Sequence, residues 1–95
     1  MICIEIVFSQ HAIRRMFERG IFPRDVRAVL TNGEVIADYP DDKPFPSKLM
    51  LGFVNDRPIH VVVAVDSAAD RCEIITTYIP DPEKWETDFR MRRPP

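Results

Sequence analysis

Apolar residues in the first third of the chain recur at the spacing of helices. A β-branched stretch over residues 2–8 predicts a strand before them. Ser9 can provide the N-cap oxygen of a helix that ends at Gly20, where the lack of a Cβ favours a left-handed stop. The face that this helix is expected to bury in the core carries four apolar residues: Ala12, Ile13, Met16 and Phe17.

A second helix and a sheet are predicted further along the chain. Pro23 favours a first helical turn, Asp25 suits the positive end of the helix dipole, and Asn32 followed by glycine favours the stop. Alternating and β-branched residues then predict strands over 34–39, 48–54, 57–65 and 73–79. The proline-rich segment 40–47 is predicted to be a loop, because proline cannot donate a hydrogen bond to a sheet.

The C-terminal residues predict a short third helix. Asp81 is a suitable N-cap with Pro82 at the first helical position, and Trp85 and Phe89, four residues apart, should pack on the sheet. The expected fold is therefore α+β, a single domain over residues 1–95. It should have two N-terminal helices, an antiparallel sheet of four or five strands and a short C-terminal helix.

Composition and charge narrow the class of protein. Hydrophobic residues make up 45% of the chain, which is typical of a globular protein. The net charge of −2 argues against a general nucleic-acid binder, although residues 1–33 carry +2, residues 34–89 carry −7 and residues 90–95 carry +3. No apolar run is long enough to cross a membrane, and the N-terminus lacks the features of a signal peptide.

The two cysteines, Cys3 and Cys72, have no metal-ligand spacing around them. Both lie in stretches that predict strands, where a free thiol behaves as a small hydrophobic side chain. We therefore expect two unpaired cysteines and a location in the reducing cytoplasm.

The first predicted helix carries a stripe of candidate phosphate ligands. His11, Arg15 and Arg19 recur every four residues beside its apolar face. Arginine can hold a phosphate with two hydrogen bonds, and histidine can exchange a proton near neutral pH. The stripe is thus a candidate RNA- or phosphate-binding surface. The alternative is a set of solvated charges, with Arg14 and Glu18 forming an ordinary helical ion pair.

His60 lies within an apolar strand, and pairing the last two strands can place it opposite Tyr78. One interpretation is a core residue bonded to Tyr78 or to a backbone carbonyl. The other is a cleft shared with His11, in which the two imidazoles act as general base and general acid in metal-independent RNA cleavage. Tyr78 could be the acid instead. The sequence contains no motif for a metal, a nucleotide or another cofactor.

Several blocks of the sequence, in order, carry a family resemblance: FSQHAIRRMFERGIFPRDV, GEVIADYPDDKPFPS, RPIHVVVA and TTYIPDPEKW. They resemble the small bacterial domain-of-unknown-function 4258 family over nearly the whole chain. Members of that family are often encoded beside YgiT-type zinc-finger antitoxins and are similar to the RelE and BrnT ribonuclease toxins.

The resemblance implies the toxin component of a bacterial toxin–antitoxin pair, acting as an endoribonuclease on RNA, with a small antitoxin protein as its partner. The net acidic charge departs from the basic character of RelE-like ribonucleases. The alternative function is a non-catalytic module that docks a partner protein through its sheet edge or its proline-rich loop. Convergence of His11, Arg15 and His60 on one cleft would favour the enzyme. Scattered positions together with an exposed apolar patch would favour the module.

Overall fold

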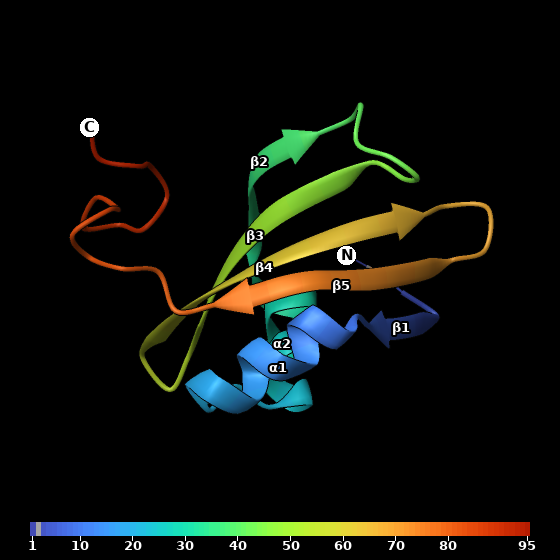
Figure 1. The fold of residues 1–95 in the computed structure, drawn as a ribbon, viewed down its shortest axis with the longest axis horizontal. Helices are drawn as coiled ribbons and strands as arrows, with labels where there is room; N and C mark the ends of the chain where they lie inside the picture. Colours follow the sequence, from blue (N-terminus) through green and yellow to red (C-terminus); the bar gives the residue numbers. More distant parts are fainter. Residues whose placement is uncertain (2) are drawn as a thin grey trace.

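The computed structural model describes residue 1 and residues 3–95, which form five strands and two helices (Figure 1). Residue 2, within the strand predicted over 2–8, lies outside the described residues. Both N-terminal helices are confirmed, and the four strands after them lie within two residues of their predicted bounds. In chain order the elements are β1 (Glu5–Phe8), α1 (Gln10–Arg19), α2 (Pro23–Asn32), β2 (Glu34–Tyr39), β3 (Ser47–Val54), β4 (Arg57–Asp66) and β5 (Arg71–Tyr78).

The strands form one mixed sheet in the order β1-β5-β4-β3-β2. The strands from β2 to β5 are antiparallel neighbours, whereas β1 runs parallel to β5 at one edge. The prediction of a wholly antiparallel sheet in a fold that begins with two helices is therefore wrong. The strand predicted over residues 2–8 forms as β1 and joins the sheet in parallel. A parallel pair cannot be closed by a tight hairpin, and here all the elements from α1 to β4 lie between its two strands.

Both helices lie on the same face of the sheet (Figure 1). Helix α1 packs on β5, and α2 packs on β3 and β4. A Cβ added at Gly52 would lie 2.8 Å from Cγ2 of Val29, so glycine at this position lets α2 lie close on β3. The core between helices and sheet consists of Ala12, Met16, Ile21, Val26, Val29, Leu30, Met50, Ile59, Val61, Val63, Cys72 and Ile74.

The ends of α1 are fixed as the sequence predicts. The Ser9 hydroxyl accepts a hydrogen bond from the Ala12 N–H at 3.0 Å and donates one to the Ile75 carbonyl at 2.9 Å, so the N-cap also attaches α1 to β5. Gly20 ends the helix in the left-handed region, with φ 65°.

The expected core face of α1 is only half buried. Ala12 and Met16 are buried, whereas the Ile13 and Phe17 side chains are 55% and 91% exposed. The four residues span about 140° of the helix surface, which is wider than the side that the sheet covers. The prediction that Ile13 and Phe17 belong to the core is therefore wrong.

The predicted C-terminal helix does not form. The Trp85 N–H bonds to the Asp81 carbonyl at 3.0 Å and completes one turn. The chain then reverses, because Trp85 pairs with Arg92 as an isolated bridge and Phe89 has a φ of 60°. This reversal brings the Phe89 carbonyl to 2.8 Å from Nε2 of His60.

Cys3 and Cys72 form a disulfide, with their Cα atoms 5.7 Å apart. The expectation of two unpaired thiols is therefore wrong. Parallel pairing of Glu5 with Arg71 brings the start of β1 beside β5 and so places the two cysteines together. Since disulfides persist mainly in oxidising compartments, the cytoplasmic location inferred from free cysteines loses its basis.

Reduction of the disulfide should lower stability strongly, because the bond closes a loop with a sequence separation of 69 residues. The loop-entropy relation gives about 4 kcal/mol for a loop of this length. Urea unfolding with and without a reductant measures the loss. The double variant Cys3→Ser/Cys72→Ser should show low stability that the reductant does not change. An unchanged midpoint for the reduced wild-type protein would contradict the role of the bond.

Met16 and Phe17 are adjacent in sequence but differ in burial, with side chains 6% and 91% exposed. We expect Met16→Ala to lower the free energy of unfolding by roughly 2–5 kcal/mol through a core cavity. Phe17→Ser should change it by less than about 0.5 kcal/mol, since it removes an exposed side chain and the two residues have similar helix propensities. Denaturant titration of both variants tests this pair, and a large loss for Phe17→Ser would mean that Phe17 belongs to the core.

Candidate functional site

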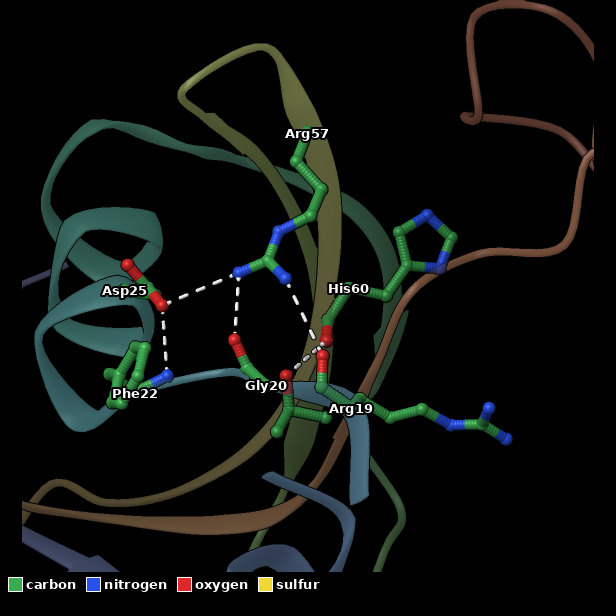
Figure 2. A network of polar contacts seen from close by, with 7 residues as sticks. Arg19, Gly20, Phe22, Asp25, Arg57 and His60 are labelled. Carbon is green, nitrogen blue, oxygen red and sulfur yellow. Dashed lines mark hydrogen bonds and ion pairs between the residues drawn. The ribbon is translucent and has the colours of Figure 1, made fainter. Parts of the chain in front are cut away.

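The cationic stripe predicted on α1 lies along one exposed flank of the helix. His11 and Arg19 are exposed, and Arg15 is partly exposed with its guanidinium 3.7 Å from the Glu18 carboxylate. The sequence suggested an ion pair between Glu18 and Arg14, but in the structure Glu18 pairs with Arg15. The side chain of Arg19 extends away from the other residues in Figure 2. The stripe is thus a row of surface charges along one helix.

His60 is fully buried on the sheet face that lies opposite the helices. Its strand neighbours Ile59 and Val61 point into the helix-covered core, so the His60 side chain points to the other face. Nε2 lies 2.8 Å from the Phe89 carbonyl and Nδ1 lies 3.2 Å from the Tyr78 hydroxyl. A carbonyl only accepts hydrogen bonds, so Nε2 carries the proton and Nδ1 accepts from Tyr78.

Burial controls the protonation of this pair. It lowers the pKa of His60, with the Phe89 carbonyl acting in the opposite direction. Burial also raises the pKa of Tyr78, the nearby Tyr39 adds to that shift, and the Arg92 guanidinium opposes it. Both groups are therefore neutral near pH 7, and the Trp85 ring packs edge-on against the imidazole with centroids 4.5 Å apart. The interpretation of His60 as a core residue bonded to Tyr78 or to a backbone carbonyl is confirmed, and both partners are present.

The sequence-predicted site residues form two separate groups. His60 and Tyr78 lie together on the face that the C-terminal segment covers, and His11, Arg15 and Arg19 lie on α1, which packs on the opposite face. The two imidazoles consequently share no cleft. A catalytic role for either group stays a prediction. No cluster of metal ligands occurs within residues 1 and 3–95.

An apolar groove lies on the other flank of α1, and sequence analysis missed it. Its volume is about 520 Å³. The exposed side chains around it include Phe17, together with Ile13 and Phe22, which are 55% and 52% exposed. The groove is lined by Phe8, Ile13, Met16, Phe17, Gly20, Ile21, Phe22 and Pro23. The signal in the sequence is the width of the apolar stripe on α1, which exceeds what one sheet contact can cover.

The turn between α1 and α2, which forms one wall of the groove, is held by Arg57 from the β3–β4 hairpin (Figure 2). Its guanidinium donates to the carbonyls of Arg19 and Gly20 at 3.4 and 3.1 Å and lies 3.5 Å from the Asp25 carboxylate. The same Asp25 oxygen accepts the Phe22 N–H at 2.8 Å. Two helix ends are thereby fixed relative to each other and to the sheet.

The rim of the groove is basic. The Arg24 guanidinium lies over the Phe22 ring, 4.7 Å from its centroid, and Arg14 precedes Phe17 by three residues on the exposed surface of α1. Neither arginine belongs to an ion pair among the described residues. The site therefore combines an apolar interior with positive charge at its edge.

Comparison with known proteins gives a family but no characterised relative. A family model described as a domain of unknown function (DUF4258) matches residues 8–79. No curated protein and no solved structure matches the chain. The matched region includes β5 and both helices, and so it contains the groove as well as His60 and Tyr78. No helix in the described part of the chain is long and apolar enough to cross a membrane.

Protonation of His60 should destabilise the protein in mildly acidic solution. Because the folded-state pKa is lowered from 6.5, the unfolded chain binds the proton more readily, and stability falls as the pH drops below about 6.5. Urea unfolding between pH 7.5 and 5.5 should show a smaller decrease for His60→Gln, which cannot titrate, than for the wild type. Equal pH dependence in the two proteins would contradict the lowered pKa.

Proposed function

Since the chain belongs to the DUF4258 family of unknown function, we propose that it is a protein-binding domain whose contact surface is the apolar groove beside α1. Phe17 carries the proposal. A phenylalanine side chain that is 91% exposed beside a groove of about 520 Å³ has no stabilising role within the chain. Large apolar patches of this kind mark sites where proteins bind other molecules. Aromatic side chains at such sites commonly supply a large part of the binding energy.

The positions of the charged residues also favour a binding domain. Metal-independent RNA cleavage requires a general base and a general acid on the two sides of one phosphate. His11 and His60 lie on opposite faces of the sheet, and His60 already uses both ring nitrogens within the fold. Of the predicted site residues, His11 and the arginines of α1 are therefore available on one face of the sheet and Tyr78 on the other.

The proposed partner is a small protein that presents apolar side chains to the groove. The family resemblance suggests an antitoxin of the zinc-finger type encoded beside this chain. Binding of such a protein in the groove would leave the cationic stripe on the opposite flank of α1 exposed. The partner proposal is therefore compatible with a toxin as well as with a module that has no activity of its own.

Phe17→Ser should abolish or strongly weaken the complex with the protein encoded by the adjacent reading frame. Loss of a central aromatic contact costs about 2 kcal/mol or more, roughly a thirtyfold increase in Kd. Co-expression followed by pull-down, and titration calorimetry of the purified proteins, measure the change. Arg15→Ala, on the opposite flank of the same helix, is the matched control and should bind normally.

The same two variants distinguish a protein-binding function from a ribonuclease activity. If expression of the wild type inhibits growth and Arg15→Ala abolishes the inhibition without affecting the complex, the cationic stripe has an activity of its own. Normal binding by Phe17→Ser, or no complex with a folded neighbour protein, would overturn the groove as the contact surface.

A further inference from the structure

We propose that the groove receives an amphipathic helix with acidic flanks, presented by the partner protein. This inference rests on the proposed protein-binding function and names the chemistry of its ligand. The shape of the groove, the charges on its rim and the exclusion of other occupants each support it independently.

The wall contributed by α1 has the spacing of a helix-packing surface. Ile13, Phe17 and Gly20 follow one another at intervals of four and three residues and form a single exposed ridge. A partner helix with apolar side chains at the same spacing can interdigitate with such a ridge. Gly20 has no side chain and therefore leaves a gap between Phe17 and Phe22, into which one large apolar side chain of the partner would insert.

The charges at the rim select acidic flanks on that helix. Arg24 stacks on Phe22 with its guanidinium at the mouth of the groove, and Arg14 lies on the other side of Phe17. The nearby carboxylates are already engaged, since Glu18 pairs with Arg15, and Asp25 binds Arg57 and the Phe22 N–H. A helix that carries Asp or Glu beside its apolar face would complement both arginines.

A second copy of this chain fits the groove poorly. Pairing of two α1 helices through Phe17 would bring Arg14 and Arg24 of one copy close to the same residues of the other, and like charges would oppose the contact. The chain's own C-terminal segment is attached to the opposite face of the sheet through His60. A membrane surface has no large side chain to insert into the hollow that these residues line.

Designed peptides provide the test, because they need no knowledge of the natural partner. The probe is a fluorescently labelled amphipathic helix of roughly 15–18 residues with Leu and Phe on one face and Glu on both flanks. A second peptide carries Lys in place of Glu, and a third has the Glu peptide's composition in scrambled order. Fluorescence anisotropy gives their affinities, and increasing salt should weaken the binding of the Glu peptide.

The Glu peptide should bind at least about tenfold more tightly than the Lys peptide or the scrambled peptide. Phe17→Ser should lose binding of the Glu peptide, and Arg14→Glu/Arg24→Glu should reverse the preference towards the Lys peptide. Lys84→Ala, which removes an exposed cation on the C-terminal segment at the opposite face of the sheet, serves as the control with unchanged binding. The double charge reversal is made at exposed positions, and its circular dichroism spectrum checks that it folds.

Failure of this inference is distinguishable from failure of the proposed function. If no peptide binds but the neighbouring protein binds in a Phe17-dependent manner, the groove is a protein site that takes a different element. Equal binding of the Glu and Lys peptides would contradict the proposal that Arg14 and Arg24 select a helix with acidic flanks. Phe17-dependent binding to phosphatidylcholine–phosphatidylserine vesicles, with no binding of the peptides, would overturn the protein ligand altogether.

Discussion

The Arg57 guanidinium joins three parts of the chain that are far apart in sequence. From the β3–β4 hairpin it reaches the last carbonyls of α1 and the Asp25 carboxylate at the start of α2 (Figure 2). A cation at the negative end of one helix dipole is favourable, as is a carboxylate at the positive end of the next. Asp25 is nearly fully buried, so an uncompensated charge there would be costly. This contact sets the angle of the α1–α2 turn and, with it, the shape of the groove.

The apolar surface of helix α1 is wider than the area that the sheet covers. The side of the helix that carries Ala12 and Met16 packs in the core, and the Ser9 cap attaches the helix to β5. With this orientation fixed, Ile13 and Phe17 point away from the sheet on one flank, and Arg15 and Arg19 lie on the other. The same rotation of α1 therefore produces both the apolar groove and the cationic stripe, which explains why Phe17 and Arg15 make a matched pair of probes.

The second face of the sheet is closed by the C-terminal segment rather than by a helix. His60 is the anchor, since one ring nitrogen binds the Phe89 carbonyl, the other accepts from Tyr78, and the ring packs against Trp85. A buried imidazole with two partners is a stable arrangement because neither polar atom is left without a hydrogen bond. Both ring nitrogens of His60 are therefore engaged within the fold.

The sequence by itself determined the elements whose signals are local. The two helices with their Ser9 and Gly20 ends and the strands from β2 to β5 follow from caps, turns and periodicity. The sequence allowed His60 to lie opposite Tyr78, but a one-residue slip would have separated them, so the pairing of the strands decided this contact. Tertiary structure alone decided which elements meet: the parallel position of β1, the disulfide between Cys3 and Cys72 that follows from it, and the side of α1 left exposed. The periodicity of the sequence indicates which face of a helix is apolar, but the packing of neighbouring elements determines how much of that face is covered. The C-terminal helix was mispredicted for the same reason, because residues 81–89 contact His60 on β4, and no local signal in that segment indicates those contacts.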